Sequence, residues 1–218
     1  MPFNQRKNHT LLILFILTIL FNASGSFAQK LSMAEAKHAG DSIIPEAILP
    51  FWQSLTLKEK VAQTLMVYMP SASYIKKHQF GGVLIMKPHL KDTLHLKEEL
   101  SLANESLKIP LLTAIDQEGG KVNRLQAISP EWKNLPSAKE MRTMTDDSVY
   151  NLAKQIGNAL HHYGINLNLA PVLDPPKDSK GKPSFIEVSN RSFGEFETAV
   201  PKIRSFVKGM KESKVLST

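Results

Sequence analysis

The segment Ile109-Pro-Leu-Leu-Thr-Ala-Ile-Asp-Gln-Glu-Gly-Gly-Lys-Val-Asn-Arg124 decides the fold of this 218-residue chain. It begins with the apolar run 111–115, whose length and composition predict a buried β-strand. The run ends in three polar residues and a Gly-Gly pair, and glycines let a ligand approach the main chain closely. Polar groups at the end of a buried strand are typical of binding sites in α/β enzymes. We therefore interpret the segment as a strand that leads into a site, rather than as a strand followed by a solvated turn.

Candidate strands and helices alternate on both sides of this segment. The predicted strands are the apolar runs 61–69, 81–86, 111–115 and 165–172, with the start of a fifth at 214–218. Two predicted helices begin at the Thr56–Glu59 capping box and at Thr145, and two more are predicted over residues 92–107 and around residues 200–210. This alternation predicts right-handed βαβ units and a mainly parallel sheet. The fold class is therefore α/β, and the pattern fits the N-terminal half of a (β/α)₈ TIM-type barrel, which usually needs about 250 residues. A self-contained doubly wound domain is the alternative, although no glycine-rich nucleotide fingerprint follows any strand.

The predicted strand 165–172 alternates apolar residues with Asn166, Asn168 and Ala170. We expect the apolar side chains to meet helices and the amides to point into the barrel, where they can hold a neighbour or a ligand. Asp174 ends this strand as Asp116 ends the previous one. A carboxylate at a strand end is more often a turn residue than a ligand contact, so Asp174 is a secondary candidate for the site.

The N-terminus has the pattern of a secretory signal peptide over residues 1–28. Arg6 and Lys7 precede an apolar run at 11–21, and Ser26-Phe27-Ala28 is a small-residue cleavage site. We expect residues 29–50 to form an arm and residues 51–218 to form the domain of an exported protein, periplasmic or secreted. The apolar run is shorter than the roughly 20 residues of a membrane span, and an uncleaved N-terminal anchor is the alternative.

Composition excludes several classes of function. The chain contains no cysteine, which excludes disulfides, a catalytic thiol and lipid attachment through cysteine. The net charge is +7, but the lysines are spread along the chain without a basic stripe, so we expect no nucleic-acid partner. His161 and His162 lack the carboxylate spacing of a metal site, and we expect neither a metal nor a cofactor.

Four segments resemble, in the right order, the motifs of glycoside hydrolase family 3, and in particular its bacterial β-N-acetylglucosaminidases (β-N-acetylhexosaminidases). Residues 57–63 are similar to the LxEKxxQ helix, 116–124 to DQEGGRVQR, 164–174 to GIxLxFAPVxD and 190–194 to (D/N)R(S/A)F. The resemblance runs from about residue 50 to the last residue.

This resemblance implies a barrel enzyme that removes terminal β-linked N-acetylglucosamine with retention, through a glycosyl-enzyme intermediate. It implies that Asp116, Arg124 and Arg191 bind the sugar. We read Glu118 as a structural carboxylate behind this subsite, and Asn168 and Asp174 as further supporting candidates. The implied partner is a carbohydrate containing N-acetylglucosamine, such as a glycan or a peptidoglycan fragment.

The departures from the family pattern limit what this chain is expected to do. Lys121 replaces an arginine of the motif, and the loop 175–188 is unusually rich in lysine. The Lys-His pair and the Gly-His-Gly loop, which supply the acid/base histidine, are expected just after Thr218, with the nucleophilic Asp further on. We therefore expect no catalytic residue in this chain, which we read as a fragment that is inactive alone. The alternatives are a β-glucosidase of the same family, or a non-catalytic sugar-binding or scaffold protein that ends at Thr218.

Overall fold

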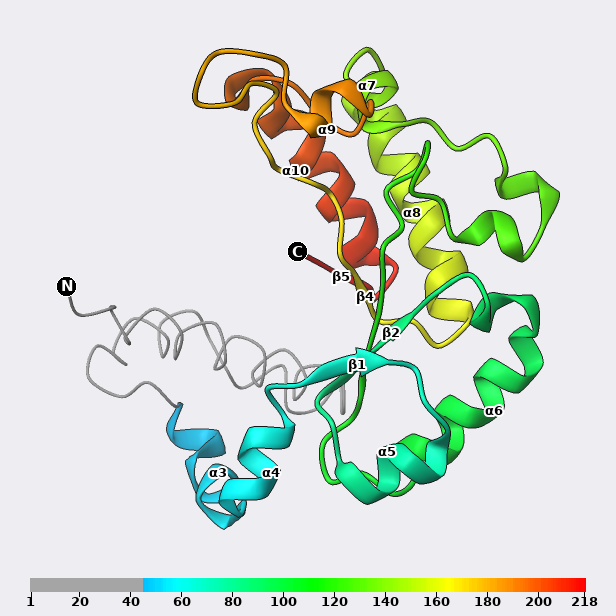
Figure 1. Cartoon of the computed structure of the whole chain (residues 1–218), viewed down its shortest axis with the longest axis vertical. Helices are drawn as coiled ribbons and strands as arrows, with labels where there is room; N and C mark the ends of the chain where they lie inside the picture. Colours follow the sequence, from blue (N-terminus) through cyan, green and yellow to red (C-terminus); the bar gives the residue numbers. More distant parts are fainter. Residues whose placement is uncertain (1–44) are drawn as a thin grey trace. The chain divides into compact units, whose positions relative to one another are not determined.

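The computed structural model describes residues 45–218 (Figure 1). The predicted signal peptide and residues 29–44 of the predicted arm lie outside the described residues. Residues 45–50 contain the short helix η1 (Glu46–Ile48) and the start of α3 (Leu49–Ser54). The arm boundary that we placed at residue 50 therefore falls inside a helix.

Helices and strands alternate as the sequence pattern indicates. The strands are β1 (Met66–Tyr68), β2 (Gly82–Ile85), β3 (Leu112–Ile115), β4 (Leu167–Asn168) and β5 (Leu216–Ser217). The other α-helices are α4 (Leu57–Ala62), α5 (Ala72–His78), α6 (Thr93–Asn104), α7 (Ala138–Met141), α8 (Asp146–His162), α9 (Phe185–Val188) and α10 (Phe196–Glu212), and the other 3₁₀ helices are η2 (His89–Lys91), η3 (Leu125–Ala127) and η4 (Pro130–Trp132). None of the helices within residues 45–218 is both long enough and apolar enough to cross a membrane.

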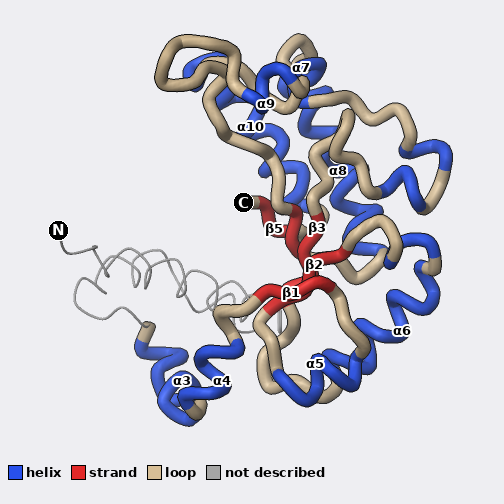
Figure 2. The backbone as a smooth tube through the Cα atoms, viewed as in Figure 1, coloured by secondary structure: helices blue, strands red, loops and turns tan. Residues whose placement is uncertain are grey.

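The strands form one sheet in the order β1-β2-β3-β4-β5 (Figure 2). β3 and β4 are parallel, with Ile115 opposite Asn168, and β4 and β5 are parallel, with Asn168 opposite Ser217. A doubly wound sheet reverses its strand order at a switch point, whereas a barrel adds each new strand on the same side. The unbroken order therefore favours the barrel winding over the doubly wound alternative.

Contacts divide the described residues into two compact units, which we describe separately. The first unit comprises residues 45–67, 71–82 and 102–111. Its predicted capping box is confirmed: Glu59 N donates to Thr56 Oγ1 at 3.2 Å, and Thr56 N donates to Glu59 Oε2 at 2.7 Å. Lys108 Nζ lies 2.5 Å from Glu59 Oε1, and this hydrogen bond, aided by those from Thr56, lowers the pKa of Glu59 to about 2. Lys108 thus ties the start of α4 to the segment that precedes β3.

The second unit comprises residues 68–70, 83–101 and 112–218. Within it, α8 and α10 pack side by side (Figure 1). Gly209 makes this close approach feasible, because a Cβ atom at that position would lie 2.5 Å from the carbonyl oxygen of Tyr150 on α8. Ser213 Oγ, just after the end of α10, donates to Lys154 O of α8 at 2.9 Å, so a side-chain hydrogen bond to the main chain also joins the two helices.

β4 is shorter than the strand predicted over residues 165–172. Ladder hydrogen bonds extend only from Asn166 N, which donates to Thr113 O, to Leu169 N, which donates to Ile115 O. Leu167 and Asn168, at successive positions of β4, are both buried. A parallel strand is covered on both faces, so burial does not distinguish its two faces.

Candidate functional site

Asp116 and Arg124 meet at the end of β3, in the second unit. Asp116 follows the last residue of the strand, and its side chain is 31% exposed. Arg124 Nη2 lies 3.3 Å from Asp116 Oδ2. The structure therefore brings together the first two residues predicted to bind the sugar, and it leaves the carboxylate open to solvent.

A tight turn between these residues returns the chain to the strand end. Glu118 N and Gly119 N both donate to Val122 O, at 2.9 and 3.2 Å, and Val122 N donates to Gly119 O at 3.0 Å. Gly119 has φ +91°, and a Cβ atom there would lie 2.1 Å from Pro136 O. Only glycine fits this position without strain, which explains the first glycine of the Gly-Gly pair.

Arg191 joins the cluster through Glu118. Arg191 Nε and Nη2 donate to the two oxygens of Glu118 at 2.8 and 2.6 Å, in a bidentate ion pair. The Glu118 carboxylate is only 7% exposed, whereas Arg191 is 24% exposed. The hydrogen bonds to Glu118, with smaller effects from the charges of Asp116 and Asp174, raise the pKa of Arg191. Arg191 therefore lies in the field of Asp116, and the nearly buried Glu118 carboxylate is the partner of its guanidinium.

Asn168 braces the end of β3 from the neighbouring strand. Its Oδ1 accepts from Gln117 N at 3.0 Å, and its Nδ2 donates to Gln117 O at 3.0 Å. Both residues are fully buried. Of the two roles open to an interior amide, Asn168 thus holds a neighbour. Asp174, by contrast, is exposed, six residues beyond the end of β4, and acts on Arg191 through its charge.

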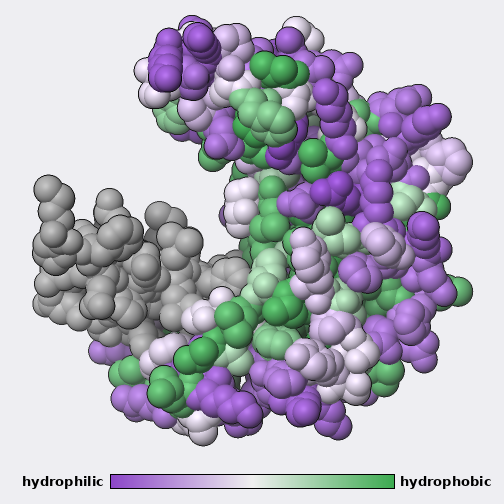
Figure 3. All heavy atoms as spheres, in the orientation of Figure 1, coloured by the Kyte–Doolittle hydropathy of each residue, from purple (hydrophilic) through white to green (hydrophobic). Residues whose placement is uncertain are grey.

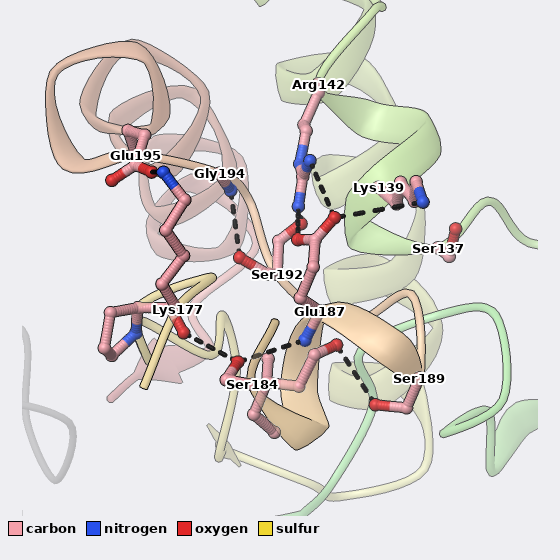
Figure 4. Close-up of polar contacts among 12 residues, drawn as sticks. Ser137, Lys139, Arg142, Lys177, Ser184, Glu187, Ser189, Ser192, Gly194 and Glu195 are labelled. Atoms are coloured by element: carbon pink, nitrogen blue, oxygen red, sulfur yellow. Dashed lines mark hydrogen bonds and ion pairs between the residues drawn. The ribbon is translucent and has the colours of Figure 1, made fainter. Parts of the chain in front are cut away.

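A second set of charged residues, which sequence reasoning missed, holds the loop that carries Arg191 (Figure 4). The Arg142 guanidinium pairs with the Glu187 carboxylate, and Arg142 Nε donates to Ser192 O at 2.9 Å. Lys139 Nζ lies 3.8 Å from Glu187 Oε1. The hydrogen bond from Arg142 lowers the pKa of Glu187. These contacts tie α7 to α9 and to the segment that follows Arg191.

Lys121, which replaces an arginine of the family motif, is exposed and lies outside the Asp116 cluster. It lines an open depression together with Lys139, Asn190 and three neighbours, Gly120, Ser137 and Glu140. Residues 45–218 contain no group of three or more His, Cys, Asp or Glu side chains placed to hold a metal ion. The side chains of the cluster itself are polar: the partly exposed Asp116 carboxylate accepts hydrogen bonds, and the guanidinium groups of Arg124 and Arg191 donate them.

Comparison with known proteins gives consistent relatives. Beta-hexosaminidase LpqI of Mycobacterium tuberculosis is 28% identical over 176 residues, which cover 74% of this chain and 42% of that protein. Beta-hexosaminidase A of Pseudoalteromonas piscicida is 32% identical over 152 residues, 66% of this chain and 25% of that protein. The chain thus spans less than half of the length of these relatives.

Solved structures with the same fold include M. tuberculosis LpqI, with a TM-score of 0.65 at 28% identity, covering 77% of this chain and 48% of that one. The beta-N-acetylhexosaminidase of Beutenbergia cavernae follows, with a TM-score of 0.61 at 26% identity, covering 75% and 53%. The N-terminal domains of such enzymes are TIM-type barrels, which confirms the predicted fold class.

The family profile described as "Glycosyl hydrolase family 3 N terminal domain" matches residues 56–218, which include β1 to β5 and every residue of the cluster around Asp116. Together with the geometry at the end of β3, this match establishes that the chain belongs to glycosyl hydrolase family 3.

Proposed function

We propose that this protein is a retaining glycoside hydrolase that removes terminal β-linked N-acetylglucosamine from glycans or peptidoglycan fragments. The names of its relatives, beta-hexosaminidase and beta-N-acetylhexosaminidase, support this substrate class. The observation that carries the proposal is the open Asp116 carboxylate, held beside Arg124 at a strand end and within the field of Arg191.

In this proposal the cluster holds the sugar rather than breaking the bond. Asp116 accepts hydrogen bonds from two sugar hydroxyls, while Arg124 and Arg191 donate to sugar oxygens. Hydrogen bonds to charged groups contribute about 1.5–3 kcal/mol each. Contacts that strengthen as the sugar ring flattens accelerate the reaction as well as binding the substrate.

Hydrolysis of 4-nitrophenyl N-acetyl-β-D-glucosaminide tests the proposal, with the protein expressed from its complete reading frame. Asp116→Ala removes two charged hydrogen bonds, and we expect it to lower kcat/KM by about 100-fold or more. Asp147→Ala, in the exposed first turn of α8, is the matched control and should leave the rate unchanged.

Two outcomes would replace the proposal. Hydrolysis of aryl β-glucosides alone would indicate the glucosidase branch of the family. Binding of N-acetylglucosamine without hydrolysis of either substrate would indicate a non-catalytic sugar-binding protein.

We also propose that the protein is exported, to the periplasm or beyond it, with residues 1–28 removed. The basic, apolar and small-residue segments of the N-terminus support this proposal. Mass spectrometry of the mature protein should find an N-terminal peptide that begins at Gln29, and an intact Met1 peptide in the exported fraction would contradict it.

A further inference from the structure

The side chain of Gln117 is built into the site but makes none of the proposed sugar contacts. It is fully buried. Its neighbours in the sequence are Asp116, whose side chain is partly exposed, and Glu118, which is nearly buried and paired with Arg191. Its Oε1 accepts from Arg124 N at 2.8 Å and from Leu125 N at 3.0 Å. One amide oxygen therefore satisfies two consecutive backbone donors where η3 begins.

The orientation of this amide is fixed by its oxygen. Gln117 Nε2 has no hydrogen-bond partner within residues 45–218. Rotating the amide by half a turn would place NH₂ against the two backbone N–H groups, and both hydrogen bonds would be lost. A buried donor left without a partner costs about 1–3 kcal/mol, so two such losses hold the amide in a single state.

The backbone of Gln117 is fixed as firmly as its side chain. Asn168 bonds to both the N–H and the carbonyl of Gln117, and Asn168 lies on β4 between β3 and β5. The chain of hydrogen bonds therefore runs from β4, through Gln117, to the main chain of Arg124.

The guanidinium of Arg124 needs this support. Its contact with Asp116 is long, at 3.3 Å, and involves one nitrogen only. Its Nε is buried, with no hydrogen-bond partner among the described residues. The direction of the guanidinium is thus set less by its own contacts than by the main chain that carries it.

We propose that Gln117 is a positioning residue that fixes the main chain at Arg124, so that the guanidinium is held beside Asp116 on the same side of the proposed sugar subsite. This inference rests on the proposed role of Arg124 and Asp116 in binding the sugar. It assigns Gln117 no contact with the substrate.

Two substitutions of nearly equal size test the inference in the protein expressed from its complete reading frame. Gln117→Met removes the acceptor, and we expect the Kd for N-acetylglucosamine to rise about tenfold. Gln117→Glu keeps an oxygen that accepts both N–H groups, and it should retain binding within about threefold of the unaltered protein. The control is Gln63→Met, because Gln63 is also buried and has one side-chain hydrogen bond, to Gln79 O, in the first unit.

A second readout does not depend on sugar binding. The NMR signal of the Arg124 Nε–H group should shift or broaden in Gln117→Met but not in Gln117→Glu or Gln63→Met. In the unaltered protein, the N–H groups of Arg124 and Leu125 should be strongly protected from hydrogen exchange, and this measurement needs no variant to fold.

The outcomes separate the inference from the proposed function. If the unaltered protein binds no N-acetylglucosamine, the proposed function fails, and the Arg124 signal decides the positioning role alone. If Gln117→Met lowers the Tm but leaves both the Kd and the Arg124 signal unchanged, the residue is merely structural and the inference is overturned. Rapid exchange of the Arg124 and Leu125 amides in the unaltered protein would overturn it as well.

Discussion

Two loops of the second unit lead from the sheet to the candidate site, and they are held in opposite ways. The loop after β3, residues 116–124, is held from inside by the buried amides of Gln117 and Asn168. The loop after β4, residues 169–184, is held from its surface. Lys177 Nζ pairs with Glu195 at 3.1 Å although their side chains are 63% and 58% exposed.

Hydrogen bonds at the tip of the second loop, residues 178–182, join residues of the loop itself. Asp178 Oδ1 accepts from the backbone N–H groups of Lys180 and Lys182, at 2.8 and 2.9 Å. Figure 3 shows hydrophilic residues gathered at this end of the molecule, at the upper left of the view. Exposed ion pairs contribute about 0–1 kcal/mol, whereas a buried donor or acceptor left unpaired costs about 1–3 kcal/mol. The difference indicates that the loop after β3 is rigid and that the loop after β4 is adjustable.

The largest test of this contrast uses two glycines with similar backbone angles. Gly119→Ala combines an unfavourable φ with a Cβ placed 2.1 Å from Pro136 O, and we expect a loss of about 3–4 kcal/mol in unfolding free energy. Gly181, at the tip of the other loop, has φ +74° and no atom within 4 Å of an added Cβ. Gly181→Ala should therefore cost only about 1 kcal/mol, from backbone strain alone. Urea denaturation measures both values, and equal losses would contradict the contrast.

A smaller effect is expected from the ion pairs. Glu118→Gln removes the charge of a nearly buried carboxylate and weakens its bidentate bond to Arg191, which should cost about 2–3 kcal/mol and also weaken sugar binding. Glu195→Gln, which affects the exposed pair with Lys177, should change stability by less than about 0.5 kcal/mol. The unfolding free energy and the Kd for N-acetylglucosamine are measured for both variants. An equally large loss of stability in Glu195→Gln would show that the second loop is held as rigidly as the first.

The smallest expected effect is a loss of stability at low pH. Arg142 lowers the pKa of Glu187 below its ordinary value of 4.5, so the folded protein binds a proton there less readily than the unfolded chain. This contribution to stability is therefore complete above about pH 4.5 and is lost as the pH falls through the lowered pKa. Denaturation midpoints between pH 6 and pH 3 should fall less steeply for Glu187→Gln than for the unaltered protein. Parallel pH profiles would show that Glu187 contributes nothing to stability through its charge.

Local signals in the sequence predicted several of the helices and strands, including the strand that leads into the rigid loop. The apolar run of β3, the capping box at Thr56 and the periodicity of α8 each depend on neighbours within a few residues. Asp116 and Arg124 are eight residues apart, so a single turn is enough to bring them together. Their closeness could therefore be expected from this segment alone.

Contacts between residues that are far apart in the sequence could not be predicted in this way. Glu118 and Arg191 are 73 positions apart, and only the family motifs indicated that Arg191 belongs to the site. Arg142 and Glu187 are 45 positions apart in segments without a motif, so nothing local indicated that they would pair. The importance of Gln117 was also hidden, because a polar residue between two acids is typical of a solvated strand end rather than of a fully buried amide.

The segment 169–195 has a fixed point at each end. β4 before it is paired with β3 and β5, and α10 after it packs closely against α8 at Gly209. For a loop between fixed ends, each doubling of length costs only about 0.6 kcal/mol in closure entropy. Insertions and deletions at the tip of this segment, around residues 178–182, are therefore expected to cost little stability as long as both ends stay fixed. A change of length at this loop tip would therefore leave Asp116 and the residues that support it in place.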